Sequence, residues 1–156
     1  MSATRETAAP RFVPMTEHEL QQVLDIENAN YEFPWSRNIF LDCIKVGYRC
    51  VALQLDGVVA AYAVMSVAAN EAHLLNLCVA PEYQGRGYGR VMLEHMLDAA
   101  RRLHAGTCFL EVRRSNRKAI RLYHAAGFNQ IGIRKDYYPA VQGREDAVTY
   151  AIELRA

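Results

Sequence analysis

The spacing of hydrophobic residues along the chain follows two periods, one typical of helices and one typical of strands. Thr16 and Glu19 form a capping box, and the apolar stripe that follows them predicts a helix. Ser36 precedes a second stripe of the same kind. Short apolar runs bounded by turn residues predict strands, and Asp56-Gly57 predicts a hairpin between two of them.

The elements follow one another in the order βααβββαβαββ, which predicts an α/β domain with a mixed, twisted, seven-stranded sheet and helices on both faces. The strand over 73–79 is apolar almost throughout, so we expect both of its faces to be buried. In chain order the predicted elements are strand 11–15, helices capped by Thr16 and Ser36, strands 48–54, 58–67 and 73–79, helix 88–103 with Val91, Met92, Leu93, Met96 and Leu97 inward, strand 108–112, a helix capped by Ser115 and ended by Gly127, and strands 128–134 and 147–154.

Length and composition indicate one globular domain. The chain has 156 residues, of which 51% are hydrophobic and 22% charged. We expect a flexible segment over residues 1–9 and a single domain over 10–156. No apolar run is long enough for a membrane span and the N-terminus lacks the apolar core of a secretory signal, so we expect a cytoplasmic protein. The four cysteines show no CxxC spacing, and no cluster suggests a metal.

Charge is distributed unevenly although the net charge is only +1. Residues 84–124 hold 9 Lys/Arg against 3 Asp/Glu, whereas residues 1–83 hold 5 against 10. The basic segment favours an anionic ligand. The acidic first part suits a cationic acceptor such as a basic peptide, and ordinary solvated surface charge explains it equally well.

A glycine-rich turn joins the apolar strand 73–79 to the helix that follows. Gly85, Gly87 and Gly89 allow the backbone to approach a ligand, and the first N–H groups of the helix favour an anion. The turn lacks the Gly-Lys-Ser/Thr of a Walker A loop, and its spacing differs from the dinucleotide fingerprint. We therefore predict a pyrophosphate cradle of another type, with side-chain donors from Gln84, Arg86 and Arg90.

This turn, Gln84-Gly85-Arg86-Gly87-Tyr88-Gly89, resembles the Gln-x-x-Gly-x-Gly loop of the GNAT superfamily of N-acetyltransferases. Four further stretches are similar to the RimI type, bacterial enzymes that acetylate the N-terminal alanine of a small-subunit ribosomal protein. The likeness covers roughly residues 10–154. These stretches are FPWS at 33–36, LEVRRSN at 110–116, LYHAAGF at 122–128 and YYPAVQGREDA at 137–147.

The resemblance implies the acetyltransferase fold, acetyl-coenzyme A as cosubstrate, and direct attack by the acceptor amine in a ternary complex. The partners it implies are acetyl-coenzyme A and the N-terminal peptide of a ribosomal protein, with no nucleic acid, no membrane and a monomeric enzyme. Acceptors of another kind remain open, namely other proteins, lysine side chains or small-molecule amines. A non-catalytic module that binds acetyl-coenzyme A or RNA is a further alternative.

Two residues carry the predicted chemistry. Glu111 lies mid-strand, where we expect a buried carboxylate, and it occupies the position of the family's general base. Tyr123 matches the family's proton donor to the departing thiolate. The alternatives are a structural ion pair between Glu111 and Arg113 or another basic neighbour, and core packing for Tyr123. His73 is the rival base.

The resemblance also implies how the cosubstrate is held. The backbone of Leu77, Cys78 and Val79 pairs with the pantetheine amides, and Asn116 contacts the pantetheine with its side chain. A helix-start hydrogen bond is the alternative role for Asn116. The full set of predicted cofactor-binding residues is Leu77, Cys78, Val79, Gln84, Gly85, Arg86, Gly87, Tyr88, Gly89, Arg90 and Asn116.

Two regions are predicted to select the acceptor. One precedes the second helix and contains Trp35, and the other is a polar loop over residues 135–145. Within that loop, Tyr137 and Tyr138 are candidates to wall the acceptor slot, although aromatic residues also pack beneath loops.

Overall fold

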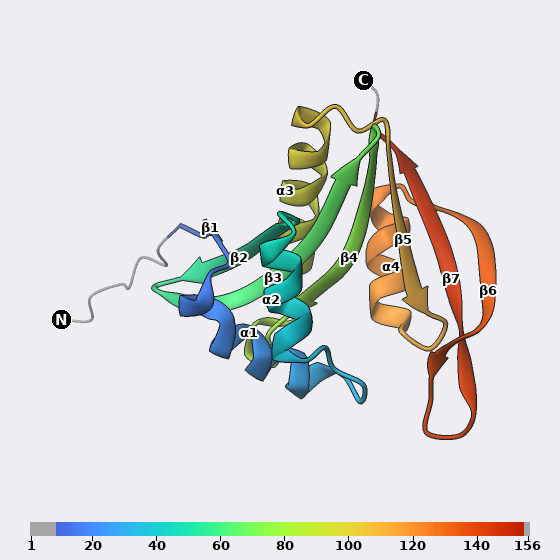
Figure 1. The fold of residues 1–156 in the computed structure, drawn as a ribbon, viewed down its shortest axis with the longest axis horizontal. Coiled ribbons are helices and arrows are strands. Elements are labelled where there is room, and N and C mark those ends of the chain that lie inside the picture. The colour runs from blue at the N-terminus through green and yellow to red at the C-terminus, as the bar shows by residue number, and fades with distance from the viewer. Residues whose placement is uncertain (1–8, 155–156) are drawn as a thin grey trace.

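The computed structural model describes residues 9–154, so all but the last residue of the predicted flexible segment 1–9 lies outside the described residues. The observed order βααβββαβαββ, with one added 3-10 turn, is the predicted one (Figure 1). The elements are β1 (Arg11–Pro14), α1 (Glu17–Asn30), α2 (Arg37–Lys45), β2 (Arg49–Leu55), β3 (Val58–Ala68), β4 (Glu71–Val79), η1 (Pro81–Tyr83), α3 (Tyr88–Arg102), β5 (Thr107–Arg113), α4 (Arg117–Ala126), β6 (Asn129–Pro139) and β7 (Arg144–Glu153).

The described strands form one seven-stranded sheet in the order β1-β2-β3-β4-β5-β7-β6. Every pairing is antiparallel except that of β4 with β5, which is parallel. That parallel pairing runs only from Glu71 opposite Thr107 to Leu74 opposite Leu110. Both strands continue beyond this point without pairing to each other, so they diverge there. The later part of β4 therefore has a free backbone edge on the β5 side.

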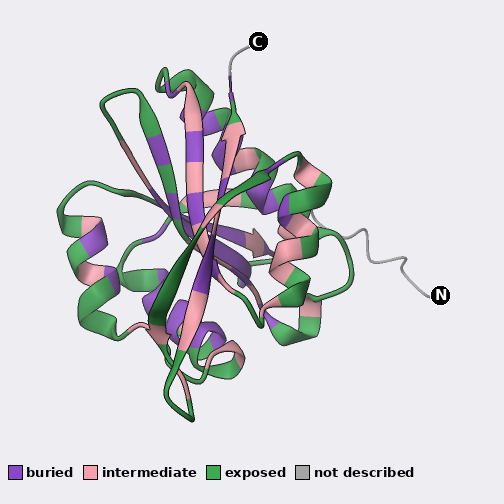
Figure 2. Ribbon diagram, turned by 90° about the vertical axis from the view of Figure 1, so that its right-hand side faces the viewer, coloured by how far each residue is buried: buried purple, intermediate pink, exposed green. Residues whose placement is uncertain are grey.

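Helices cover both faces of the sheet, as predicted. The buried side chains of α3 and α4 pack on one face of the sheet, with Cys108, Leu110 and Val112 of β5. Those of α1 and α2 pack on the other face, against Tyr62 and Val64 of β3. Figure 2 shows the buried residues concentrated in the strands between these layers. The edge strand β6 is exposed over most of its length.

Three details of the sequence prediction are wrong. In β4 buried and exposed positions alternate at the start of the strand, and Leu75 is 42% exposed, because no helix covers that part of the face. Val91 on α3 is 39% exposed instead of inward. The N-cap of α4 is Asn116, whose Oδ1 accepts from Ala119 N–H at 3.2 Å, and not Ser115.

The predicted loop over 135–145 is also different in the structure. β6 extends to Pro139 and β7 begins at Arg144, so most of this segment is a long hairpin arm rather than a loop. The pairing register shifts between Arg134 and Tyr138. The residues of this arm are polar and exposed on both faces, so they lack the hydrophobic alternation that predicts a strand. An arm that projects beyond the helices does not pack on the core and needs no apolar face.

Candidate active site

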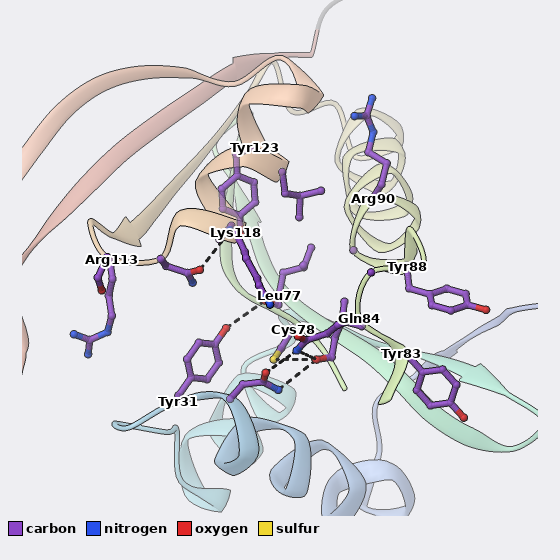
Figure 3. A pocket seen from close by; sticks show the side chains of 18 of the residues that line it. Tyr31, Leu77, Cys78, Tyr83, Gln84, Tyr88, Arg90, Arg113, Lys118 and Tyr123 are labelled. Atoms are coloured by element: carbon purple, nitrogen blue, oxygen red, sulfur yellow. Dashed lines mark hydrogen bonds between the residues drawn. The ribbon is translucent and has the colours of Figure 1, made fainter. Parts of the chain in front are cut away.

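A cavity of about 790 Å³ opens where β4 parts from β5. Its walls come from the end of α1 and the loop after it, the later part of β4, the glycine turn, the start of α3, α4 and the tip of the β6–β7 arm. Figure 3 shows the side chains that face it. The predicted residues that line it are Leu77, Cys78, Val79, Gln84, Gly85, Gly87, Tyr88, Gly89, Arg90, Asn116 and Tyr123.

The glycine turn needs its glycines for two different reasons. Gly85 and Gly87 have φ angles of 77° and 86°, in the left-handed region that other residues avoid. Gly87 is the N-cap of α3 and has no side chain to cap the helix, so the first N–H groups of α3 are free to bind a ligand. At Gly89 a Cβ would lie 3.4 Å from a Leu122 methyl, which is an ordinary van der Waals contact.

The polar side chains of the turn are used within the protein. Gln84 Nε2 donates to Asn30 Oδ1 at 2.8 Å and to Val79 O at 3.0 Å, which occupies both N–H groups of its amide. Arg90 pairs with Glu94 at 2.7 Å. Arg86 lies over the Tyr83 ring and does not line the cavity. These internal contacts leave the uncapped backbone N–H groups at the start of α3 as donors without a side-chain partner.

The later part of β4 turns alternate backbone groups toward the cavity. Just past the strand, Ala80 N–H donates to Ala60 O of β3 at 2.8 Å. Antiparallel pairing then directs the N–H and C=O groups of Leu77 and Val79 away from β3. The Cys78 side chain is buried, and burial raises the pKa of its thiol to about 11, so it is not a ready nucleophile.

Tyr31 is a cavity residue that the sequence analysis missed. Its hydroxyl donates to Leu77 O at 3.4 Å, as the dashed line in Figure 3 marks. Burial, reinforced by the neighbouring Cys78 and Tyr123, raises its pKa well above the ordinary value. Tyr31 is the extended C-cap residue just after α1, so the apolar stripe of the helix does not indicate it. Phe33, from the predicted acceptor region 33–35, also lines the cavity, and so does Lys118, which was not predicted.

Tyr123 reaches the cavity from α4, opposite Tyr31 (Figure 3). Its side chain is 7% exposed and packs edge-on against Phe128, with ring centroids 5.5 Å apart. Burial, and then the proximity of Cys108 and Cys78, raises its pKa above the ordinary value. The phenol therefore keeps its proton throughout the pH range in which the protein works.

Glu111 lies on the other face of β5 from the Tyr123 cluster, because alternate residues of a strand face opposite ways. Its side chain is 27% exposed, so the expectation of a buried carboxylate is wrong. The Arg134 guanidinium lies 3.7 Å from it, whereas Arg113, the partner considered first, pairs with Glu145. Glu111 is not among the residues that line the cavity.

Arg113 lines the cavity and contacts both the loop after α1 and the β6–β7 arm. Its guanidinium carbon lies 5.3 Å from the Phe33 ring centroid and 4.5 Å from that of Tyr138. The guanidinium also donates to Pro139 O at 2.7 Å and to Glu145 at 3.1 Å.

The predicted acceptor residues differ in position. Tyr138 lies beside Arg113, whereas the Tyr137 ring packs edge-on against Tyr138 and its side chain is 42% exposed. The Trp35 ring packs on Phe40, with centroids 5.2 Å apart, and does not line the cavity. The rival base His73 also lies outside the cavity lining, near Glu71 at 3.8 Å.

Comparison with known proteins identifies this architecture. The model of the GNAT acetyltransferase family matches residues 17–128. The chain belongs to the GNAT acetyltransferase family.

Among curated relatives of this acetyltransferase, the [ribosomal protein bS18]-alanine N-acetyltransferase of Escherichia coli strain K12 is 40% identical over 136 residues, which are 87% of this chain and 92% of that protein. The enzyme of the same name from Haemophilus ducreyi is 36% identical over 90% of this chain and 97% of its own. The crystal structure of the ribosomal-protein-S18-alanine N-acetyltransferase from Escherichia coli superimposes with a TM-score of 0.87 at 37% identity, covering 95% of this chain and 96% of that one.

The cavity of this acetyltransferase suits its cosubstrate, acetyl-coenzyme A. A helix N-terminus without a side-chain cap offers N–H groups to a diphosphate, and the free edge of β4 offers backbone groups to an amide chain. Within residues 9–154, no group of three His, Cys, Asp or Glu side chains is arranged to hold a metal ion. None of the described helices combines the length and apolar character needed to cross a bilayer.

Proposed function

We propose that this acetyltransferase transfers the acetyl group of acetyl-coenzyme A to the N-terminal alanine of ribosomal protein bS18. One observation carries the proposal. The chain is 40% identical to a curated enzyme with that activity, and the match covers 92% of that enzyme's length. The FPWS stretch at 33–36 and the YYPAVQGREDA stretch at 137–147 also support it, because both resemble the RimI type and both contribute residues to the cavity lining.

The proposed donor site uses backbone groups. The diphosphate lies at the N-terminus of α3, held by the glycine turn, and the pantetheine adds along the free edge of β4 at Leu77 and Val79. Asn116 supports the pantetheine, since its side chain lines the cavity while its Oδ1 caps α4. Lys118, which also lines the cavity, adds a positive charge for the phosphates.

Glu111 is the proposed general base. A free α-amino group has a pKa of about 8, so part of it is protonated at neutral pH and must lose a proton before attack. The carboxylate is partly exposed, on the side of the sheet where the arm carries Tyr138. The cosubstrate lies between β4 and α4, so Glu111 receives the proton through a water molecule rather than by direct contact.

The proposed reaction then proceeds without a covalent enzyme intermediate. The neutral amine attacks the thioester carbon, the carbonyl oxygen takes negative charge, and the C–S bond breaks as the amide forms. The surplus proton of the nitrogen is lost in this step, and the coenzyme A thiolate takes up a proton and leaves as the thiol. Tyr123 donates a hydrogen bond to the departing thiolate. Its raised pKa favours this role, because the phenol stays protonated while it stabilises the sulfur.

The acceptor terminus enters between the loop over 31–36 and the β6–β7 arm. Phe33 and Tyr138 stand on the two sides of this entrance, with Arg113 between them. Residues of both segments line the cavity, and Arg113 contacts one residue from each. We propose that a single copy of the chain acts in the cytoplasm, where ribosomal proteins are made.

A transfer assay with peptides tests this function. Acetyl-coenzyme A labelled in the acetyl group is incubated with the protein and a short alanine-headed peptide that also contains one lysine. We expect the label on the α-amino group, and none when that group is blocked beforehand. Label on the lysine, or turnover only with polyamines or aminoglycosides, would refute the proposal while leaving family membership intact.

A further inference from the structure

Glu27, near the end of α1, is a buried acid with an unusual set of neighbours. It is 2% exposed, and no ion pair among residues 9–154 involves it. Three donors satisfy it instead: Trp35 N–H to Oε2 at 2.8 Å, Asn76 Nδ2 to Oε1 at 2.8 Å, and the Tyr62 hydroxyl to Oε1. In all three contacts the carboxyl accepts the hydrogen bond.

The three donors come from three separate parts of the fold. Trp35 ends the loop after α1, Tyr62 is in the middle of β3, and Asn76 is in β4. Asn76 lies two residues past Leu74, the last residue of β4 that pairs with β5. Glu27 therefore joins the loop to β4 at the place where the cavity begins.

Further hydrogen bonds extend this connection along β4. Asn30 Nδ2 donates to Val79 O at 3.3 Å, and Tyr31 donates to Leu77 O, so the end of α1 follows the strand to the glycine turn. The loop that begins at Tyr31 carries Phe33, which faces Arg113 across the cavity. The position of these two cavity residues depends on how firmly the loop is tied at its other end, at Trp35.

We propose that Glu27 is a positioning residue for the acceptor site, which holds the loop over 31–36 against β4 so that Tyr31 and Phe33 keep their places in the cavity wall. This inference rests on the proposed function. It accounts for Trp35 of the FPWS stretch without contact to substrate, because Trp35 contributes its backbone N–H to Glu27 and its ring to the core at Phe40.

The variant Glu27→Gln tests this role while keeping the shape of the side chain. An amide has one acceptor oxygen, so it cannot accept from Trp35 on one side and from Tyr62 and Asn76 on the other. If its oxygen keeps the Tyr62 and Asn76 bonds, its NH₂ faces the Trp35 N–H and the loop loses its tie. Tyr62→Phe removes one donor only and leaves the bond to Trp35 intact.

Steady-state kinetics with the alanine-headed peptide give the first measurement. For Glu27→Gln we expect the peptide KM to rise about tenfold, because one charge-assisted hydrogen bond is lost from the acceptor wall. The KM for acetyl-coenzyme A should stay within about twofold, since β4 remains paired with β3. Tyr62→Phe should raise the peptide KM by less than about threefold.

The matched control is Val23→Ala, on the same helix and fully buried in the same core. It lowers stability but keeps all three donors to Glu27 and the sequence of the loop, so the peptide KM should change little. An equal rise in peptide KM for Val23→Ala, or no rise for Glu27→Gln, would overturn the proposal.

Hydrogen exchange gives a measurement that does not depend on turnover. In Glu27→Gln the amides of residues 31–36, above all Trp35, should exchange at least tenfold faster than in Val23→Ala. If the wild-type protein fails to acetylate the peptide, the proposed function fails, and the exchange result still decides whether Glu27 ties the loop. Equal exchange in the two variants would refute that tie.

Discussion

The guanidinium of Arg113 stacks on the ring of Tyr138, with the guanidinium carbon 4.5 Å from the ring centroid. Arg113 is the last residue of β5 and Tyr138 lies near the tip of β6, so the contact fixes the arm against the end of the central strand. Phe33 approaches the same guanidinium at 5.3 Å. One side chain thus sets the width of the proposed acceptor entrance.

Replacing Arg113 by Lys should widen this entrance. Lysine keeps the charge but loses the planar group that stacks on two rings and binds Pro139 O and Glu145 together. We expect the peptide KM to rise about five- to tenfold, with the acetyl-coenzyme A KM nearly unchanged. Arg101→Lys, in an exposed pair with Asp98, is the control and should alter neither constant. A parallel rise in both constants for Arg113→Lys would contradict this account.

Gly87→Ala should weaken acetyl-coenzyme A binding through the backbone alone. Nothing lies within 4 Å of a Cβ built at Gly87, but its φ of 86° costs a residue with a side chain about 1–2 kcal/mol. The turn should relax and withdraw the N–H groups of α3. Isothermal titration should show at least a fivefold weaker Kd, together with a lower Tm.

Gly89→Ala provides the comparison, because its φ is ordinary and its Cβ would meet Leu122 at 3.4 Å. That distance is ordinary van der Waals contact and alanine is the better helix former, so Gly89→Ala should keep the fold and the Tm. If Gly89→Ala weakened acetyl-coenzyme A binding as strongly as Gly87→Ala and the two variants had the same Tm, backbone strain at Gly87 would not be the cause of the weaker binding.

Glu111→Gln and Tyr123→Phe should separate chemistry from binding. General-base catalysis contributes about 10²–10⁴-fold, so Glu111→Gln should lower kcat by at least about 10² with little change in acetyl-coenzyme A affinity. Tyr123→Phe keeps the packing on Phe128 and should also act on kcat. Rapid-quench measurements of the chemical step should reveal both losses. Wild-type rates in either variant would remove that residue from the mechanism.

Glu145 should make the stability of the arm depend on pH below the neutral range. Although burial alone raises the pKa of this carboxyl, hydrogen bonds from Ser115 and Arg113 outweigh it, and the pKa is lowered overall. A lowered pKa contributes stability that is fully present above the unfolded value, about 4.3, and is lost as pH falls through the folded value.

The variant Glu145→Gln should therefore lose less stability than the wild type when the pH drops from 6 to 3. Chemical denaturation across this range measures the difference. Identical pH profiles for the two proteins would show that the Glu145 contacts do not contribute.

Cysteine should be dispensable for turnover. Burial raises the pKa of the Cys78 thiol to about 11 and that of Cys108 to about 12, so both stay protonated at neutral pH and neither is a ready nucleophile. Cys78→Ala should keep kcat within about threefold, which allows for the small cavity it leaves. Mass spectrometry during turnover should find no acetyl-cysteine, and a kinetically competent one would refute direct attack.

The sequence was sufficient to predict the order of the elements and most of the cavity. Capping at Thr16, the Asp56-Gly57 turn and the glycine turn are local signals, so they can be recognised without knowing the rest of the fold. The site depends on contacts between distant segments, and those were harder to predict. Glu27, Asn76 and Trp35 are far apart in the sequence, and nothing near each of them indicates that they meet.

Individual side chains of the predicted site also depended on their neighbours. Gln84 was expected to face a phosphate, but Asn30, more than fifty positions earlier, accepts from its amide. Glu111 was expected to be buried because it lies mid-strand between apolar residues, yet its side chain is 27% exposed. Both errors arise from the three-dimensional layers, which periodicity along one strand does not specify.

The short parallel pairing of β4 with β5 has a mechanical consequence. The sheet consists of two parts, β1–β4 and β5–β7, which share only the pairs from Glu71–Thr107 to Leu74–Leu110, together with the core beneath α3. A cosubstrate wedged between them would bridge the two parts and add contacts that the free protein lacks. Ligand occupancy and resistance to unfolding are then linked, so the protein should be most rigid while its donor is bound.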